Sequence, residues 1–292
     1  MKVAVTGGTG SWDRGVGPVV IAALREAGHE VTNLDWAVPG GIAGRGFIKV
    51  DLTDYGQTFA ALYGHDAVIQ LAANGEPDWD HVSGAARFHT NTLIAYNVFQ
   101  AACFLGMKKV VWASSETVLG FPFDIVKPKL LPISDDDPPI PTSSYGISKA
   151  VTEDLARHMN RRYGVPFIGL RFSNIFYDTP GHVTGYDKVP SFWDDPISRS
   201  FNLWGYVDSR DIAQACTRAL VADVHGAEAM TIAAPDTIMT QTNAELVAQC
   251  FPGCALRPGI GAHESLISID KAKRLIGYDP QWTWRRVLGR ND

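Results

Sequence analysis

Two patterns of hydrophobic and polar positions alternate along the first half of the chain. Short apolar runs, each bounded by turn residues, predict buried strands of the kind found in parallel sheets. Between these runs, apolar positions recur three and four residues apart, which is typical of one face of a helix. The runs predict strands at residues 2–6, 30–34, 46–50, 67–72, 109–113 and 167–171. The helical pattern covers residues 18–27, 55–62, 87–105 and 149–162.

This alternation predicts an α/β fold in which helices cover both faces of one doubly wound parallel sheet. The pattern changes after Arg171, because residues 173–203 are irregular, aromatic and interrupted by prolines. A helix at residues 209–222 and a strand at residues 229–233 are expected to return to the sheet. Helices at 243–249 and 269–276 predict a small C-terminal lobe. The expected boundaries are 1–172 and 207–233 for the sheet domain, and 173–206 and 234–292 for the lobe.

A glycine-rich turn follows the first predicted strand. Gly7 and Gly10 come directly after it, and Gly17 lies at the start of the next helix. In dinucleotide-binding sheets such glycines let the backbone approach a pyrophosphate, which binds at the N-terminus of that helix. The third glycine comes seven residues after the second instead of three, so residues 11–14 form an insertion. Whether Arg14 contacts a phosphate or the insertion is a surface bulge stays open at this point.

Asp35 follows the second predicted strand directly. A carboxylate at that place can accept hydrogen bonds from the ribose hydroxyls of an adenosine. It would also repel a 2′-phosphate, so the sequence favours NAD over NADP as the cofactor. The alternative interpretation is an Asp that only shapes a turn.

Tyr145 and Lys149 lie four residues apart where the fourth helical segment begins. In a helix, positions with this spacing share a face, so the phenol and the ammonium can point into one site. A nearby ammonium favours the phenolate, and we therefore expect the pKa of Tyr145 to lie below its usual value of about 10. Such a Tyr can pass a proton to or from an alcohol or carbonyl oxygen. The alternative is an ordinary turn of a surface helix.

A Ser-rich strand end, Val-Val-Trp-Ala-Ser-Ser at residues 110–115, lies upstream of this pair. Together with the glycine-rich turn and the Tyr145–Lys149 pair, it resembles the short-chain dehydrogenase/reductase superfamily. The resemblance is to the extended branch, the NAD-dependent epimerase/dehydratase family, and it covers nearly the whole chain. It implies a Rossmann-type fold, NAD as cofactor, a substrate-binding C-terminal lobe and a homodimer.

The resemblance also implies a role for particular residues. Ser115 would hydrogen-bond the reacting oxygen, with Thr117 assisting and Ser114 as a rival one position away. Asn91 would be a structural and proton-relay residue, although a solvent-facing helix Asn is the alternative. Tyr145 would be the acid/base, and Lys149 would hold the nicotinamide ribose. The remaining implied contacts are Asp51 and Leu52 beside the adenine, Leu71, Ala72 and Ala73 under the cofactor, and Asn174 and Arg257 at the substrate. Asp211 is expected to cap the helix that follows it.

Composition and charge narrow the possible partners. The net charge of −5 gives no general attraction to nucleic acid or to an anionic membrane. The chain has no apolar run of about 18 residues, and the glycines after Thr6 break the pattern of a signal peptide. Its four cysteines offer no zinc ligand set and are expected to be buried thiols in a reducing compartment. We therefore predict a cytoplasmic protein without nucleic-acid, membrane or metal partners.

Three functions compete at this stage. The first is an NAD-dependent dehydrogenase of a sugar or related polyol, and the second is a nucleotide-sugar epimerase or dehydratase. The third is a non-catalytic NAD-binding regulator, which does not need the set Ser115, Tyr145 and Lys149. Nucleotide-sugar relatives grip a diphosphate with converging cations. Here the matching stretch keeps Arg257 but lacks the Asp that usually follows, so we expect a uronate-like or simple sugar substrate without a nucleotide.

Overall fold

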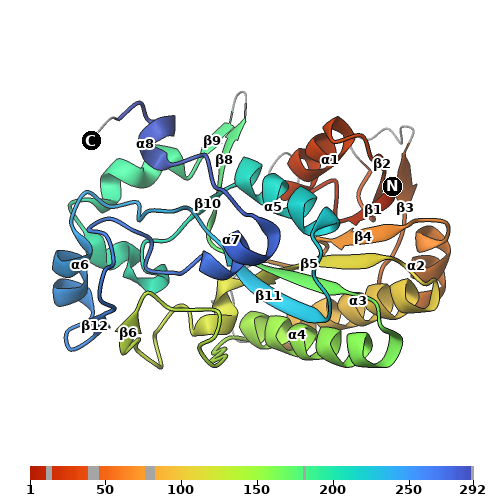
Figure 1. Cartoon of the computed structure of the whole chain (residues 1–292), viewed down its shortest axis with the longest axis horizontal. Coiled ribbons are helices and arrows are strands. Elements are labelled where there is room, and N and C mark those ends of the chain that lie inside the picture. Colours follow the sequence, from red (N-terminus) through yellow and green to blue (C-terminus); the bar gives the residue numbers. More distant parts are fainter. Residues whose placement is uncertain (11–14, 39–45, 76–82, 180–181, 291–292) are drawn as a thin grey trace.

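The computed structural model describes residues 1–10, 15–38, 46–75, 83–179 and 182–290 (Figure 1). At its centre lies a seven-stranded sheet in which all neighbouring strands are parallel. The strand order is β11-β7-β5-β4-β1-β2-β3. The strands are β1 (Lys2–Thr6), β2 (Glu30–Asp35), β3 (Phe47–Lys49), β4 (Ala67–Gln70), β5 (Lys109–Ser115), β7 (Phe167–Phe172) and β11 (Ala227–Ile232). The order reverses between β1 and β4, and sheets of this kind bind ligands at the carboxyl ends of the strands beside such a reversal.

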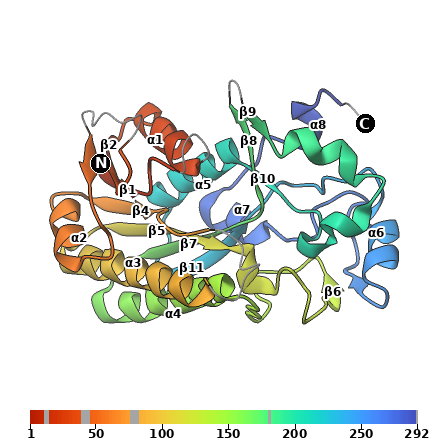
Figure 2. The same ribbon diagram turned by 180° about the vertical axis from the view of Figure 1, so that it is seen from behind.

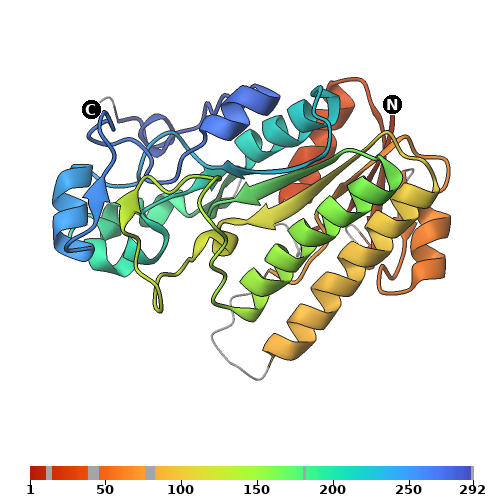
Figure 3. The same cartoon turned by 60° about the horizontal axis from the view of Figure 1, so that its bottom comes forward.

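Helices cover both faces of the sheet, which confirms the predicted α/β, doubly wound, Rossmann-type fold (Figure 1). One face carries α1 (Val16–Glu26), α5 (Ser209–Val221) and α7 (Asp270–Ile276). The other face carries α2 (Tyr55–Leu62), α3 (Gly84–Phe104) and α4 (Ser144–Tyr163). In Figure 3 the long helices α3 and α4 lie side by side below the sheet.

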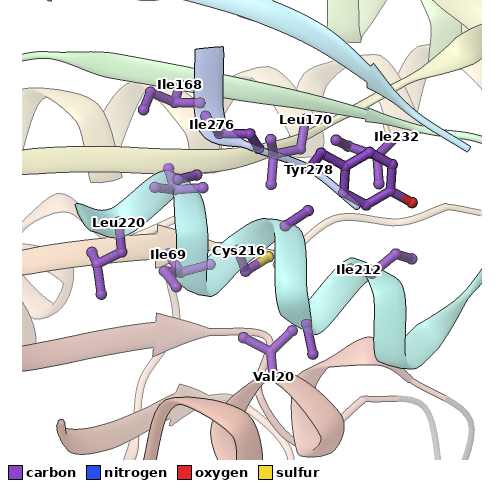
Figure 4. Packing of buried hydrophobic residues seen from close by; sticks show 14 of the residues in the cluster. Val20, Ile69, Ile168, Leu170, Ile212, Cys216, Leu220, Ile232, Ile276 and Tyr278 are labelled. Atoms are coloured by element: carbon purple, nitrogen blue, oxygen red, sulfur yellow. The ribbon is translucent and has the colours of Figure 1, made fainter. Parts of the chain in front are cut away.

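Strand residues alternate between two apolar clusters, one on each face. Val3 and Val5 of β1 point into the cluster under α1 and α5, whereas Ala4 points to the side of α3. Both faces of the sheet are covered by helices, so the strands are apolar at consecutive positions, as the sequence pattern predicts. Figure 4 shows the first cluster, where Cys216 of α5 and Ile276 of α7 pack against strand residues. The helix at residues 269–276, which we expected in the C-terminal lobe, therefore packs on the sheet. The division of the chain into two domains stays a prediction.

The end of the molecule away from α2 and β3, where α6 (Asn243–Cys250) and α8 (Trp284–Val287) lie in Figure 2, is built around a third, aromatic cluster. This cluster includes Trp204, Tyr206 and Trp284. Residues 173–203, which the sequence pattern leaves irregular, contain two short strands and two 3-10 helices. These elements and the neighbouring strand are β8 (Ile175–Thr179), β9 (His182–Thr184), η3 (Tyr186–Phe192), η4 (Pro196–Asn202) and β10 (Val207–Asp208). A Pro-rich loop at residues 121–142 joins this end of the molecule through β6 (Leu130–Leu131), which pairs with β12 (Ala255–Leu256).

One predicted cap is wrong. The N-cap of α5 is Asp208, whose side chain accepts the backbone N–H of Arg210. Asp211 lies in the first turn instead, and its carboxylate accepts the backbone N–H groups of Gln281 and Trp282 at 2.9 and 3.0 Å. Asp211 therefore fastens the C-terminal segment to the start of α5, a contact between distant parts of the chain.

Candidate active site

The site forms where the carboxyl end of β5 meets the first turn of α4. Strand β5 ends at Ser115 and continues directly into the 3-10 helix η2 (Glu116–Leu119). Helix α4 begins at Ser144, earlier than predicted, because the side chain of Ser143 caps it by accepting the N–H of Gly146 at 3.0 Å. A Cβ at Gly146 would lie 3.0 Å from the carbonyl oxygen of Thr117. The missing side chain lets the first turn of α4 pack directly on η2.

Tyr145 and Lys149 share one face of α4, as their spacing predicts. The Lys149 ammonium lies over the Tyr145 ring, 5.4 Å from its centroid. It donates a hydrogen bond to the carbonyl oxygen of Ala113 on β5 at 2.7 Å. Lys149 is buried, so this bond fixes the ammonium next to the strand that carries Ser115.

The predicted direction of the Tyr145 pKa shift is wrong for the protein by itself. Burial raises the pKa of Tyr145 to about 12, and the carboxylate of Glu116 adds to the increase, although hydrogen bonding to Ser115 opposes it. Although the ammonium of Lys149 lies over the ring, the free-energy cost of burying a phenolate is the larger effect on the pKa. Burial also lowers the pKa of Lys149 to about 8, against the opposing charge of Glu153.

The structure separates the two neighbouring serines. The Ser114 hydroxyl donates to Glu153 at 2.7 Å inside a buried ionic network. Ser115 lies on the opposite side of the strand, where it interacts with Tyr145 and accepts the backbone N–H of Thr117 at 3.3 Å. Ser115, Tyr145 and Lys149 are therefore brought together as predicted, whereas Ser114 is engaged elsewhere.

Asn91 lies in the interior of the molecule, and the alternative of a solvent-facing helix Asn is wrong. Its side chain is only 5% exposed. The Oδ1 atom accepts the backbone N–H of Asn74 at 2.8 Å, and the amide nitrogen donates to the carbonyl oxygen of Asn74 at 3.1 Å. Asn91 thus clamps the segment that follows β4. Its proton-relay role stays a prediction.

The glycine-rich turn has the close backbone contacts that a dinucleotide cradle requires. Gly7 and Gly10 have left-handed backbone angles, with φ of 68° and 69°. A Cβ at Gly7 would lie 2.7 Å from the backbone of Ala72, and one at Gly17 would lie 2.6 Å from the backbone of Gly8. Side chains at these positions would fill the space between the turn, helix α1 and the end of β4. The chain therefore fits a bound dinucleotide here, and Gly8 is a member of the cradle that our sequence analysis did not include.

Asp35 ends β2 and points back to this turn. Its carboxylate accepts the backbone N–H of Thr9 at 3.0 Å and that of Ala37 at 3.1 Å. The turn-shaping role is thus present. A carboxylate has about four acceptor positions, so capacity remains for ribose hydroxyls. Arg14 and the rest of residues 11–14 lie outside the described residues.

The other expected cofactor contacts surround the same end of the sheet. Asp51 accepts the backbone and side-chain groups of Thr53, and Leu52 is buried in the core. Leu71 and Ala72 are half-buried directly beside the glycine turn, and Ala73 is exposed. Their contacts with a nucleotide stay predictions.

The expected substrate residues lie in different environments. The Thr117 hydroxyl is buried without a hydrogen-bond partner in the described structure, and Asn174 accepts from Arg199 at 3.3 Å. Arg257 donates to the carbonyl oxygen of Pro132 at 3.0 Å, and its guanidinium lies 3.6 Å from Asp137. The Pro-rich loop therefore already engages Arg257.

Our sequence analysis did not select Glu116, which is 7% exposed. It directly follows Ser115, and its place between the apolar strand and the apolar residues Val118 and Leu119 was a signal for its burial. Burial raises the pKa of Glu116 to about 7, while Ser173, Arg199 and Asn202 oppose the shift. No three His, Cys, Asp or Glu side chains in the described ranges converge as a metal site would require. None of the described helices has the length and hydropathy to cross a bilayer.

The parallel sheet, its glycine turn and the Tyr145–Lys149 pair define a dinucleotide-binding α/β enzyme of the short-chain dehydrogenase type. The chain belongs to the NAD dependent epimerase/dehydratase family, whose model matches residues 3–233. NAD is accordingly its cofactor, and the glycine cradle with Asp35 is the place that fits it.

Relatives in this family differ in their reactions. An L-arabinose 1-dehydrogenase (NAD(P)(+)) of Haloferax volcanii is 32% identical over 179 residues, which cover 58% of this chain and 65% of the relative. A UDP-glucose 4-epimerase of Lacticaseibacillus casei is 25% identical over 97% of this chain and 92% of the relative. A solved short-chain dehydrogenase/reductase superfamily protein from Agrobacterium tumefaciens with bound NAD superposes with a TM-score of 0.72 at 23% identity, covering 99% and 95% of the two chains. The last similarity concerns the fold alone.

Proposed function

We propose that this protein is an NAD-dependent dehydrogenase that oxidises a hydroxyl group of a free sugar or a related polyol. The family supplies NAD-dependent chemistry on sugars, and what has to be chosen is the kind of sugar and the net reaction. The relative named as an L-arabinose 1-dehydrogenase supports a free sugar, although the match spans less than two thirds of that enzyme.

The observation that carries this choice is the position of Arg257. A nucleotide-sugar site needs cations that are free to meet a diphosphate. Arg257 is the cation that the sequence offers for this purpose, and it is bound to the carbonyl of Pro132 and faces Asp137 at 3.6 Å. Releasing it for a diphosphate would leave Asp137 without this partner. The arrangement therefore supports a substrate without a nucleotide.

The residues of the site have distinct tasks in such a reaction. Oxidation of an alcohol removes the proton from the hydroxyl oxygen and a hydride from the carbon that carries this oxygen. NAD, when bound, supplies the hydride acceptor. We assign the proton to the phenolate oxygen of Tyr145, and the orientation of the substrate hydroxyl to Ser115. Lys149, held by Ala113, is placed to bind a ribose hydroxyl and to favour the phenolate once the positive nicotinamide ring is close.

A nucleotide-sugar 4-epimerase or dehydratase is the second candidate. The match to a UDP-glucose 4-epimerase over 97% of this chain favours it, because that relative shares the lobe as well as the sheet. Such an enzyme oxidises and re-reduces its substrate without net formation of NADH. A non-catalytic NAD-binding regulator has no need for a buried Tyr145–Lys149 pair next to Ser115, so we assign it the lowest rank.

A screen for NADH formation tests the proposal. The purified protein is incubated with NAD and with free pentoses and hexoses, their uronates, UDP-hexoses and GDP-mannose. We expect NADH only with free sugars or their simple derivatives, and a rise in melting temperature with the same compounds. Interconversion of UDP-hexoses without NADH would replace the proposal with the epimerase.

We also propose a homodimer and a cytoplasmic location. The exposed apolar side chains on α3 and α4 support the dimer, and they include Tyr96 and Val151. The four cysteines are all free thiols, and burial raises the pKa of Cys216 to about 12. Free thiols persist in a reducing compartment, so they support the cytoplasmic location.

A further inference from the structure

One face of helix α4 contacts three consecutive residues of strand β5. The helix residues are four positions apart and therefore share a face, and they are Tyr145, Lys149 and Glu153. Tyr145 interacts with Ser115. Lys149 donates to the carbonyl oxygen of Ala113 at 2.7 Å. Glu153 accepts the hydroxyl group of Ser114 at 2.7 Å. The first two contacts belong to the proposed reaction centre, whereas the third has no task in it so far.

The carboxylate of Glu153 is fixed by two neighbouring strands. Ser114 of β5 and Arg171 of β7 are register partners in the sheet, and both donate to Glu153. Its Oε1 atom accepts Ser114 at 2.7 Å and Nε of Arg171 at 2.9 Å, and its Oε2 atom accepts Nη2 of Arg171 at 2.8 Å. The exposed fractions are 2% for Ser114 and Glu153 and 4% for Arg171. Hydrogen bonds to a charged acceptor are strong and directional, so the carboxylate has one defined position.

The contact with Ser114 bears on the direction of Ser115. Successive side chains of a strand point to opposite sides, so a contact that holds Ser114 on one side also sets Ser115 on the other. Lys149 holds the carbonyl group of Ala113, one residue earlier. Both residues that precede Ser115 are therefore fastened to the helix that carries Tyr145.

The same carboxylate acts on Lys149. Burial lowers the pKa of Lys149 to about 8, and the negative charge of Glu153, one helical turn further on, opposes this decrease. Tyr145 is the titratable group under the ammonium, and strand β5 offers it a carbonyl oxygen. Arg171 and its second partner Asp135, 3.0 Å away, belong to the network of Glu153. Without the carboxylate, a larger share of Lys149 would be neutral near pH 7.

We propose that Glu153 is a positioning residue of the reaction centre. It orients Ser115 through Ser114, and it stabilises the charged form of Lys149 by electrostatic attraction. Neither task needs contact with substrate or cofactor, which agrees with the burial of Glu153. Both tasks rest on the proposed function, because they serve the roles assigned there to Ser115 and Lys149. A Glu–Arg pair with only a structural role would stabilise the fold and affect neither.

The charge of Lys149 can be measured without a substrate. The protein is labelled with ¹³C-lysine, the Lys149 signal is assigned by its loss in Lys149→Arg, and it is followed by NMR from about pH 6 to about pH 10. We expect Glu153→Gln to lower the proton affinity of Lys149 about tenfold. Asp154→Asn removes the same charge from a side chain that is 64% exposed, and it should leave the titration unchanged. A wild-type titration in Glu153→Gln overturns the proposal.

Ser114→Ala tests the orientation of Ser115. This variant removes the hydroxyl group but keeps the pair of Glu153 and Arg171. We expect kcat of the NAD-loaded protein with its best sugar to fall about tenfold or more, while KM and the Lys149 titration stay as in wild type. Thr217→Val, which removes a hydroxyl hydrogen bond on the opposite face of the sheet, should keep the wild-type kcat. A wild-type kcat in Ser114→Ala overturns the proposal, also where Glu153→Gln does not fold.

The two measurements separate the failure of this proposal from that of the proposed function. Absence of NADH with every sugar overturns the proposed function, and the Lys149 titration still decides whether Glu153 stabilises the ammonium. An active wild type whose Glu153→Gln titration or Ser114→Ala turnover matches wild type overturns the positioning role and leaves the dehydrogenase intact.

Discussion

Burial moves the pKa values of Tyr145 and Lys149 in opposite directions. The phenol is held neutral with a pKa of about 12, and the ammonium is destabilised to a pKa of about 8. Both shifts favour the neutral form of the side chain, because burial disfavours a charge. Tyr145 is therefore protonated in the protein by itself, and we expect the positive ring of a bound cofactor to favour the phenolate.

The first prediction concerns the Tyr145 hydroxyl. Tyr145→Phe removes the group that we propose as the acceptor of the substrate proton, and general acid–base catalysis contributes about 10²–10⁴-fold to a rate. We expect kcat to fall by about three orders of magnitude, while the affinity for NAD, measured by calorimetry, stays nearly constant. Tyr163→Phe at the far end of the same helix is the matched control, because its hydroxyl accepts a hydrogen bond from Gln100 and is no part of the candidate site. Similar turnover by wild type and Tyr145→Phe would contradict the assignment.

Glu116 gives a prediction about stability. Its pKa is near 4.5 before folding and about 7 in the folded protein, so the folded state binds the proton more tightly. The free energy of unfolding therefore falls as the pH rises from about 4.5 through 7, by on the order of 3 kcal/mol. Glu116→Gln cannot ionise, so we expect it to raise the melting temperature at pH 8.5 and to have little effect near pH 4. An equal effect at both values would show that burial of this charge is not its cause.

The spacing of Tyr145 and Lys149 was sufficient to predict that they share a face, because helix geometry is local, whereas Ser115 was selected over Ser114 through the family resemblance. The environment of each residue depends on distant parts of the chain. Glu116 is buried by η4, more than eighty residues further on, and this burial decides both its own pKa and part of the Tyr145 shift. A sequence window around Tyr145 contains nothing that reports on that packing.

At the scale of elements, a buried ionic network fastens α4 to the sheet. Arg171 of β7 donates to both carboxylate oxygens of Glu153 at 2.9 and 2.8 Å and also pairs with Asp135 at 3.0 Å. Asp135 accepts from Thr231 of β11, so the network joins the Pro-rich loop, the sheet and the helix that carries Tyr145. We therefore expect the position of Tyr145 to depend on this network.

The third prediction tests that connection. Glu153→Gln leaves Arg171 with an incomplete partner in the interior, and breaking a buried pair costs about 3–5 kcal/mol. We expect a loss of unfolding free energy of about this size by denaturant titration. Asp154→Asn is the matched control, because the neighbouring side chain is 64% exposed and pairs only with Arg157 on the surface. Its effect should stay within about 0.5 kcal/mol. Equal losses in both variants would mean that the network does not hold α4.

The strands and helices of the sheet were predictable because short apolar runs and a 3.6-residue period can be recognised from neighbouring positions alone. The short strands β8 and β10 were not, since they pair with each other across about thirty residues of intervening chain. The choice between Asp208 and Asp211 as the cap of α5 failed for a related reason. Both acids suit a helix start, and the segment at Gln281 and Trp282 decides which one is free to cap.

At the scale of the whole molecule, α3 and α4 present an apolar surface away from the sheet. Figure 3 shows the two helices side by side at the edge of the fold. The groove between them is lined by His89, Thr92, Leu93, Tyr96, Val151, Thr152 and Leu155. Two copies of this surface, related by a two-fold axis, would bury these side chains in a four-helix interface.

The fourth prediction follows from this surface. Val151 is 42% exposed, and Val151→Glu places a charge where the two copies would meet. We expect wild type to be a dimer by light scattering at micromolar concentration and the variant to be a monomer. Ile197→Glu on η4, where the side chain is 62% exposed, is the control and should remain a dimer. A monomeric wild type would contradict the proposed assembly.

The central claim is that the protein catalyses a net oxidation of a free sugar with NAD. The most direct test is the fate of the hydride, followed by mass spectrometry with a sugar that carries deuterium on every carbon-bound position. We predict that one deuterium appears in the NADH formed, that NADH and oxidised sugar accumulate in equal amounts, and that Tyr145→Phe forms neither. A deuterium that stays in the sugar, in an epimerised product and without NADH, would contradict the claim.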